Sequence, residues 1–315
     1  MNQLRRAFLK KTSLAVGALF SPIPLFSAAE DESKISIHVF SKHLQFIESF
    51  DELSDFVASC GFDGTDLTIR PNGHILPAEV EERLPEAASA LQKNNLSIKT
   101  ITTAITTAED LNTFKILKAA NNVGIKYYRM GYFDYLESVS MPERLFNLKP
   151  NIWQLSKMNS DFKIHGAYQN HAGTRIGASV WDIWDLIKSA NPEWIGCQFD
   201  IRHAVVEGGT SWPNDLKLLQ EYVKTVVVKD FKWENKNGKW QVTDTPLGEG
   251  MVDFQTFFKQ LKSFGFAGPI SLHFEYPLPV NDKALSKAEI KAKTKGLMQK
   301  DLKKLKTYLQ EAELL

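Results

Sequence analysis

Imidazole and carboxylate side chains recur along this 315-residue chain at positions where they could bind a metal or move protons. His171, Asp200 and the pair His273 and Glu275 each end or follow a short β-rich run. Imidazole nitrogens mixed with carboxylate oxygens suit Mn, Zn, Co or Fe better than Ca or Mg. We therefore expect one divalent metal. Its predicted ligands are His171, Asp200, His273 and Glu275.

A second set of polar residues could act on a substrate. Glu275 is the predicted general base, because a carboxylate beside a metal can be tuned toward that task. Lys229 is the alternative base, since burial beside other cations would favour its uncharged form, and His203 is the third predicted catalytic residue. Cationic side chains also suit oxyanions or sugar hydroxyls. The predicted substrate-binding residues are Asp66, Arg70, His74, Arg129, Gln169, Trp233 and Trp240.

A structural role is the competing interpretation for each of these residues taken singly. A lone buried histidine can serve only as a hydrogen-bonded part of the core. Arg70 and Arg129 could form structural ion pairs with Asp66 or Asp134. Several imidazoles together with carboxylates at one end of a fold favour a reaction site over these roles, and over a site that only binds a sugar.

The elements that would position these residues alternate regularly from residue 34 onward. Amphipathic runs with helical spacing separate short β-rich runs, which predict eight strands at 35–40, 64–69, 96–103, 125–130, 162–169, 194–200, 225–229 and 269–274. Eight such repeats in under 300 residues predict a (β/α)8 TIM barrel, in one domain at 30–315. A doubly wound sheet would be expected to carry a Gly-rich loop after its first strand, and 35–42 contains no glycine.

Three local patterns predict how the helices begin, pack and end. Apolar residues at 53, 56 and 57, followed by Cys60 and Gly61, predict a helix that stops at the glycine. Ser179 and Asp182 match a capping box at the start of another helix. Lysine-rich periodicity from about residue 284 predicts a C-terminal helix with a solvated face.

An insertion at 233–240 follows the seventh predicted strand. Asn237-Gly238 at its centre is a strong signal for a two-residue β-hairpin turn. Trp233 and Trp240 would share one face of this hairpin, where they could pack against each other or form a stacking platform for a sugar ring. Because loops after barrel strands lie at the catalytic end, we expect the hairpin near the site.

Residues 1–29 are predicted to be a twin-arginine export signal outside the folded domain. Arg5 and Arg6 precede a mildly apolar run at 14–26, with Leu4 where Ser or Thr is usual, and small residues at 27–29 offer a cleavage site. The run is shorter than the roughly 20 residues that span a bilayer. We therefore expect a periplasmic or secreted protein with no membrane anchor after cleavage.

Charge and cysteine content exclude several classes of protein. The chain has 38 basic and 37 acidic residues, and cleavage after Ala29 would remove four basic residues and no acid, leaving 34 against 37, a net charge of −3. Such a chain has no electrostatic attraction to a nucleic-acid backbone. The two cysteines, Cys60 and Cys197, rule out a disulfide scaffold, and we expect both to be free thiols.

At these residues the chain resembles the xylose isomerase-like barrels, the sugar phosphate isomerase/epimerase family, across residues 35–280. The segments that carry the resemblance are GTDLTIRPNGH (64–74), YYRMG (127–131), YQNH (168–171), GCQFDIRH (196–203), VKD (228–230), LGEG (247–250) and SLHFE (271–275). The resemblance implies a TIM barrel that acts on a small carbohydrate. It also implies one divalent metal that stabilises an enediolate.

The resemblance also implies four ligand positions, and this chain departs from most of them. The family pattern of Glu, Asp, His and Glu on the last four strands falls on Gln169, Asp200, Val227 and His273. Gln169 cannot act as a base and Val227 cannot bind a metal. Three readings stay open: an isomerase or epimerase with the rebuilt ligand set, a lyase that performs β-elimination on an oxidised sugar, and a carbohydrate-binding barrel without catalysis. A DNA-repair endonuclease of the same fold is disfavoured by the net charge.

Overall fold

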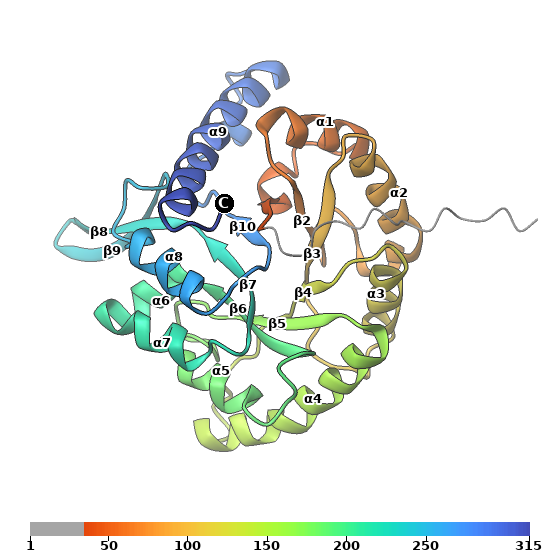
Figure 1. The fold of residues 1–315 in the computed structure, drawn as a ribbon, viewed down its shortest axis with the longest axis vertical. Coiled ribbons are helices and arrows are strands. Elements are labelled where there is room, and N and C mark those ends of the chain that lie inside the picture. Colours follow the sequence, from red (N-terminus) through yellow and green to blue (C-terminus); the bar gives the residue numbers. More distant parts are fainter. Residues whose placement is uncertain (1–34) are drawn as a thin grey trace, which may run out of the picture. The chain divides into compact units, whose positions relative to one another are not determined.

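The barrel predicted from the sequence is present in the computed structural model, which describes residues 35–315; the predicted export signal at 1–29 lies outside them. Eight parallel strands close in the order β1-β10-β7-β6-β5-β4-β3-β2, with helices around them (Figure 1). The strands are β1 (Ile37–Phe40), β2 (Gly64–Ile69), β3 (Ser97–Thr103), β4 (Tyr127–Arg129), β5 (His165–Gln169), β6 (Ile195–Asp200), β7 (Val223–Val228) and β10 (Ile270–Leu272). This confirms the predicted fold class.

Helices follow the strands and cover the outside of the barrel (Figure 1). The α-helices are α1 (Phe50–Cys60), α2 (Val80–Gln92), α3 (Leu111–Asn122), α4 (Met141–Phe162), α5 (Val180–Ile187), α6 (Ile201–Gly208), α7 (Trp212–Leu218), α8 (Phe254–Ser263) and α9 (Lys287–Glu311). Short 3-10 helices lie at η1 (Ser41–Leu44), η2 (Pro77–Glu79), η3 (Gly209–Ser211) and η4 (Pro279–Asn281). Within residues 35–315, no helix is long and apolar enough to cross a membrane.

The local predictions for the helices are confirmed at α1 and at the C-terminal helix α9, and wrong at the start of α5. Helix α1 buries Leu53, Phe56 and Val57 and stops at Gly61, whose φ of 89° is the left-handed conformation that glycine adopts without strain. Helix α5 begins after Ser179, but the Ser179 side chain makes no cap hydrogen bond. Asp182 accepts instead from the Gly177 N–H. The predicted capping box is therefore wrong, because the carboxylate is used by the preceding loop.

The predicted hairpin is formed by β8 (Asp230–Lys236) and β9 (Lys239–Thr245), which pair antiparallel beside the barrel (Figure 1). Asn237 and Gly238 both have positive φ, 56° and 79°, as a type I′ turn requires. The register pairs Trp240 with Asn235, two residues from Trp233, so the two indoles lie on one face. Both are exposed, at 40% and 68%, which leaves a platform role open.

Asp230 fixes the loop that follows the hairpin. Its carboxylate accepts hydrogen bonds from the backbone N–H groups of Gly248, Gly250 and Val252, at 2.9, 3.0 and 3.3 Å. A Cβ at Gly250 would collide with Asp230 Oδ1 and with the Phe231 carbonyl oxygen. This close approach leaves room only for glycine at position 250, opposite the carboxylate of Asp230.

Gly250→Ala should therefore destabilise the fold, whereas Gly296→Ala should not. The first change forces the loop away from Asp230, an overpacking cost of about 1–3 kcal/mol. Gly296 lies within α9 with nothing within 4 Å of a built Cβ, so alanine there should be neutral or add up to about 1 kcal/mol of helix propensity. Urea unfolding of both variants checks the difference, and equal midpoints would contradict this account of Asp230.

Candidate active site

The predicted site residues lie at the C-terminal ends of the barrel strands, where TIM-barrel chemistry takes place. Asp66 lies on β2, Arg129 ends β4, Gln169 ends β5 and Asp200 ends β6. Lys229 and His273 directly follow β7 and β10, and Val228 pairs with Leu272, so these two residues leave neighbouring strands at one level. All six side chains are buried.

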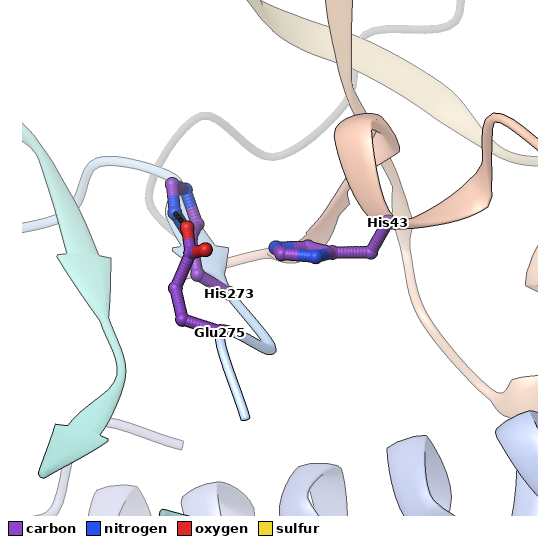
Figure 2. A group of neighbouring side chains, drawn as sticks. All are labelled: His43, His273 and Glu275. Atoms are coloured by element: carbon purple, nitrogen blue, oxygen red, sulfur yellow. Dashed lines mark ion pairs between the residues drawn. The ribbon is translucent and has the colours of Figure 1, made fainter. Parts of the chain in front are cut away.

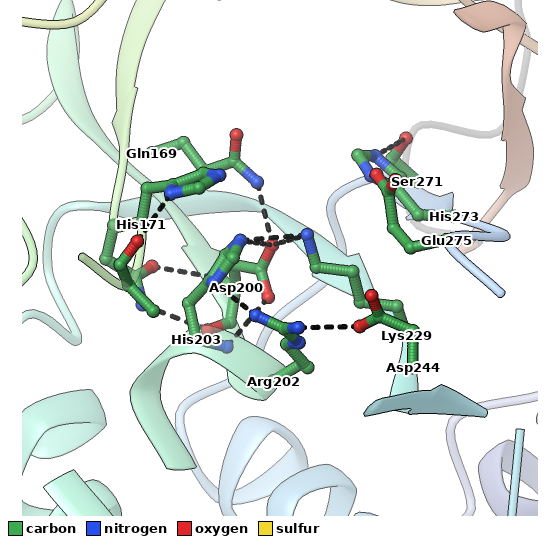
Figure 3. A network of polar contacts seen from close by, with 12 residues as sticks. Gln169, His171, Asp200, Arg202, His203, Lys229, Asp244, Ser271, His273 and Glu275 are labelled. Atoms are coloured by element: carbon green, nitrogen blue, oxygen red, sulfur yellow. Dashed lines mark hydrogen bonds and ion pairs between the residues drawn. The ribbon is translucent and has the colours of Figure 1, made fainter. Parts of the chain in front are cut away.

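A first cluster, which we call the lysine group, consists of Gln169, Asp200, Arg202, His203 and Lys229 (Figure 3). Lys229 Nζ lies 3.0 Å from Asp200 Oδ2 and 2.9 Å from His203 Nε2. Gln169 donates to the same Asp200 oxygen at 2.7 Å. The carboxylate of Asp200 thus holds side chains from two neighbouring strand ends.

The other Asp200 oxygen begins a helix. Asp200 is the N-cap of α6, and Oδ1 accepts from the backbone N–H of His203 at 3.1 Å. This is the ordinary N-cap contact with the third helical residue. The Asp-x-x-His spacing at 200–203 therefore has a structural cause: it places the imidazole of His203 beside the carboxylate that starts its own helix.

Arg202, a member of the lysine group, contacts Asp244 on the hairpin, and neither residue was predicted from the sequence. Arg202 NH1 lies 3.0 Å from His203 Nδ1, and Arg202 NH2 lies 2.6 Å from Asp244 Oδ1 on β9. The hairpin residue that contacts the lysine group is therefore Asp244, and neither tryptophan makes this contact. Burial holds the pKa of His203 well below its usual value, so the imidazole is uncharged at neutral pH.

Gln169 is held on its other side by Arg129 and Tyr132. Both donate to Gln169 Oε1, at 3.1 and 2.6 Å. Arg129 thus bonds an amide. The alternative considered above, an ion pair with Asp66 or Asp134, is not among the ion pairs of residues 35–315, and Asp134 pairs with Arg175. Arg129 Nε is buried without a partner among those residues. An unpartnered donor of this kind suits a substrate oxygen.

The predicted metal ligand His171 lies against His203. The two rings are 3.9 Å apart, and His171 Nδ1 is 2.9 Å from the Ala172 carbonyl oxygen. Burial lowers the pKa of His171, so this ring is also uncharged at neutral pH. His171 therefore lies beside the lysine group and apart from His273 and Glu275, two of the other predicted metal ligands (Figure 3).

A second cluster, the histidine group, consists of His43, His273 and Glu275 (Figure 2). One possible ligand atom from each lies within 4.8 Å of the others, and this is the one such group of three among residues 35–315. His43 lies in η1, directly after β1, and no residue of that strand end was predicted from the sequence. Lys42 lies beside it and pairs with Glu275 at 2.9 Å.

Hydrogen-bond donors fix the tautomer of His273. Ser271 Oγ donates to Asp66 Oδ2 at 2.8 Å, so the hydroxyl accepts from His273 Nε2, 3.1 Å away. The proton of His273 is therefore on Nε2, and Nδ1 carries a lone pair. Nδ1 is buried without a hydrogen-bond partner among residues 35–315, with Glu275 Oε1 at 3.8 Å.

The pKa values of the histidine group follow from burial and charge. Burial lowers the pKa of His273 to about 3 and that of His43 to about 4, so both rings are uncharged at neutral pH. Burial alone would raise the pKa of Glu275, but contact with His273 and the positive charge of Lys229 bring this pKa below its usual range. Glu275 is thus a carboxylate already satisfied by cations.

The residues present do not form the family's four-ligand metal site. Gln169 donates to Asp200 through its amide and Val227 has no ligand atom. Lys229 Nζ already contacts Asp200 Oδ2, at 3.0 Å. The rebuilt set is not assembled either, because His171 and Asp200 are absent from the group of His43, His273 and Glu275. In that group Lys42 already binds the carboxylate, and His43 Nε2 accepts from the Phe274 N–H.

Of the remaining predicted substrate-binding residues, Arg70 and His74 lie in the loop after β2, and Trp233 and Trp240 lie on the hairpin strands β8 and β9. His74 follows β2, and its backbone N–H donates to Thr68 Oγ1 at 2.9 Å. Arg70 Nε is buried without a partner among residues 35–315. Trp233 contacts Phe231, with ring centroids 6.3 Å apart, and among the described ring pairs Trp233 is not paired with Trp240.

Cys60 and Cys197, the two cysteines of the chain, are both free and buried.

Asp66 predicts a pH-dependent stability. Burial raises the pKa of Asp66 to about 6, against about 3.9 in an unfolded chain. The folded state therefore holds this proton more tightly, so the contribution is full below about pH 4 and is lost as the pH rises through about 6. Wild type should lose up to about 3 kcal/mol of unfolding free energy relative to Asp66→Asn over that interval. Urea unfolding at both ends measures it, and a difference that does not change with pH would contradict the buried acid.

Comparison with known proteins places this geometry in context. No curated protein matches the chain. Among solved structures, the chain is similar to a 3-keto-D-glucoside 4-epimerase from E. coli, with 15% identity, TM-score 0.61 and coverage of 87% of this chain and 100% of that one. It is also similar to a D-allulose 3-epimerase from Methylomonas sp. in complex with D-allulose, with 16% identity, TM-score 0.63 and coverage of 88% of this chain and 98% of that one. A third similar structure is a xylose isomerase-like TIM barrel protein from Mycobacterium smegmatis in complex with magnesium. It has 14% identity, TM-score 0.61 and coverage of 87% of this chain and 98% of that one.

These likenesses are low in identity and support the fold. The family described as "Xylose isomerase-like TIM barrel" matches residues 54–297, which is most of the described barrel. The match includes the lysine group and, of the histidine group, His273 and Glu275, whereas His43 lies before its first residue. With eight parallel strands, polar residues at their C-terminal ends and this match, the chain belongs to the xylose isomerase-like TIM barrel family.

Proposed function

We propose that this chain is an isomerase or epimerase of a small carbohydrate, which removes the proton on the carbon next to a carbonyl group and returns it. The observation that carries the proposal is the lone pair on His273 Nδ1, buried without a partner among residues 35–315. A nitrogen lone pair without a hydrogen-bond partner can accept the α-proton. The named activities of the similar structures, two of them sugar epimerases, favour this reaction class.

His273 replaces Glu275 as the proposed base. Both oxygens of Glu275 accept from Lys42, at 3.2 and 2.9 Å. Because the ammonium group stabilises the negative charge, the carboxylate is a weaker proton acceptor. The imidazolium formed on His273 would face Glu275 Oε1 at 3.8 Å, so the carboxylate stabilises the charge that the transfer creates. Glu275 thus acts through His273 in this proposal.

Donors without partners are proposed to bind the sugar. Arg70 Nε and Arg129 Nε are buried and unpartnered among residues 35–315, and each can donate to a hydroxyl or carbonyl oxygen. Both side chains come from strand ends that face the same barrel mouth. No step of the proposal passes through a metal, because the family ligand positions hold Gln169 and Val227.

Solvent deuterium uptake tests this function. Incubating the protein in D2O with D-allulose and with a 3-keto-D-glucoside, and following each sugar by proton NMR, should show exchange at the carbon next to the carbonyl. His273→Gln keeps a donor to Ser271 but has no basic nitrogen, so exchange should fall by about 100-fold or more, the usual worth of a general base. Glu275→Gln should cost less, because the base itself is kept.

Matched controls separate catalysis from folding. His165→Gln changes another buried histidine, at the start of β5 and hydrogen-bonded to the Glu193 carbonyl oxygen, and should leave exchange unchanged. If Glu275→Gln loses more activity than His273→Gln, Glu275 is the base after all. Loss of a leaving group from the sugar, rather than exchange alone, would indicate the lyase. A requirement for added Mn²⁺ would contradict the metal-free route.

Export remains a separate proposal about residues outside the described structure. We propose that Arg5 and Arg6 direct the folded chain through the twin-arginine route to the periplasm or the medium. Changing both to lysine should leave full-length precursor inside the cell, as detected by immunoblotting of cell fractions. An unchanged yield of the shortened form outside the cytoplasm would show that another secretion route is used.

A further inference from the structure

Two arginine side chains at the barrel mouth have no carboxylate partner within residues 35–315. Arg129 ends β4 with 6% of its surface exposed, and Arg70 directly follows β2 and is partly buried. Neither is among the ion pairs of those residues, and the Nε atom of each is buried without a hydrogen-bond partner there. A buried positive charge without a counter-charge costs free energy. An anion that binds at this point would therefore be stabilised.

The two guanidinium groups are close enough to act on each other. Strand register places Thr68 of β2, Thr102 of β3 and Arg129 of β4 at one level, and Arg70 follows Thr68 by two residues. Burial is the largest cause that lowers the pKa of Arg70, and the positive charge of Arg129 is the second. An anion placed beside this pair would be attracted by both charges.

The carboxylates whose charge acts on Arg70 are Asp66 and Glu275, and both are held by other donors. Asp66 accepts from Thr102 at 2.9 Å and from Ser271 at 2.8 Å. Neither carboxylate forms an ion pair with Arg70 or Arg129 among residues 35–315. The ion pairs of the other cations at this end of the barrel join Lys42 to Glu275, Lys229 to Asp200, Arg175 to Asp134 and Arg202 to Asp244.

Arg129 is held in position by its neighbours. NH1 donates to Gln169 Oε1 at 3.1 Å, and the guanidinium carbon lies 5.1 Å from the centre of the Tyr132 ring, which is a cation–π contact. Nε is at another corner of the planar group, so these contacts leave it able to donate. A guanidinium group that is already fixed loses little conformational entropy when it binds an oxyanion.

We propose that Arg70 and Arg129 bind a carboxylate group of the substrate, and that the substrate is a sugar acid that also carries a carbonyl group. This inference rests on the proposed function, which supplies the carbonyl and the neighbouring C–H bond. Binding energy from the carboxylate, at the ends of β2 and β4, would position a different carbon of the sugar for His273.

The number of donors favours a carboxylate over a phosphate group. The two unpartnered Nε–H groups of Arg70 and Arg129 match the two oxygens of a carboxylate. A phosphate monoester presents three oxygens and close to two negative charges, and it would need further donors. Both anions share the chemistry that recognises a guanidinium group, so the experiment has to include each of them.

Matched sugars separate the carboxylate from the rest of the molecule. 5-Keto-D-gluconate is L-sorbose with a carboxylate in place of one hydroxymethyl group, and D-glucuronate differs from D-glucuronamide in the same sense. Isothermal titration calorimetry should show that an acid binds about 10- to 100-fold more tightly than its neutral counterpart, because its hydrogen bonds to arginine are charge-assisted. L-sorbose 6-phosphate is the third ligand, with phosphate on the carbon that carries the carboxylate.

Arg70→Gln tests the site itself. The Arg70 side chain has no hydrogen bond or ion pair among residues 35–315, so the variant should fold, and urea unfolding checks this. Its preference for the acid should fall by about tenfold or more, with the affinity for the neutral sugar little changed. Arg129→Gln should give the same loss. Arg175→Gln is the control, because Arg175 also lies over the Tyr132 ring but pairs with Asp134, and it should keep the preference.

The outcomes distinguish this inference from the proposed function. Equal affinity for acid and neutral sugar in both pairs, or a preference that survives in Arg70→Gln, would overturn the inference. Tighter binding of L-sorbose 6-phosphate than of 5-keto-D-gluconate would also overturn it and indicate a sugar phosphate. Deuterium uptake into neutral sugars without any preference for acids would leave the proposed function standing alone. Arg70-dependent binding of an acid without uptake into any of these sugars would leave only the acid site.

Discussion

The carboxylate of Asp200 has no exposed surface, and its contacts lead to three different parts of the barrel mouth. One oxygen starts helix α6 by accepting from the His203 backbone, and the other accepts from Gln169 at the end of β5 and from Lys229 after β7. A buried carboxylate must be satisfied by donors. That requirement fixes where the reactive side chains of the lysine group lie.

The same carboxylate explains how a member of this family can lack the family's metal ligands. Gln169 and Lys229 satisfy Asp200 with N–H groups, so the polarity that a cation would provide is supplied by the chain itself. Arg202 constrains the tautomer of His203, since a guanidinium group can only donate to His203 Nδ1. The hairpin contributes by holding Arg202 through Asp244, which links an insertion outside the barrel to the chemistry inside it.

The histidine group is arranged by a similar chain of donors. Asp66 accepts from Ser271, which accepts from His273, and this leaves the opposite nitrogen of His273 unprotonated. Lys42 holds Glu275 at the edge of the group. The two groups come from neighbouring strands, because Lys229 follows β7 and His273 follows β10, which pair in the barrel.

The sequence by itself determined the barrel, the hairpin turn and the strand ends that carry polar residues, because period-two and period-3.6 patterns and an Asn-Gly turn are local properties of the chain. Even there, the cap predicted at Ser179 was wrong, since Asp182 bonds the preceding loop. Which polar residues meet was decided by the tertiary structure. Strand register and helix capping turned Asp200 toward Lys229 and placed His43, Arg202 and Asp244 in the site. A hydrogen-bond partner depends on the relative positions of distant segments, and residue spacing along a chain does not contain that information.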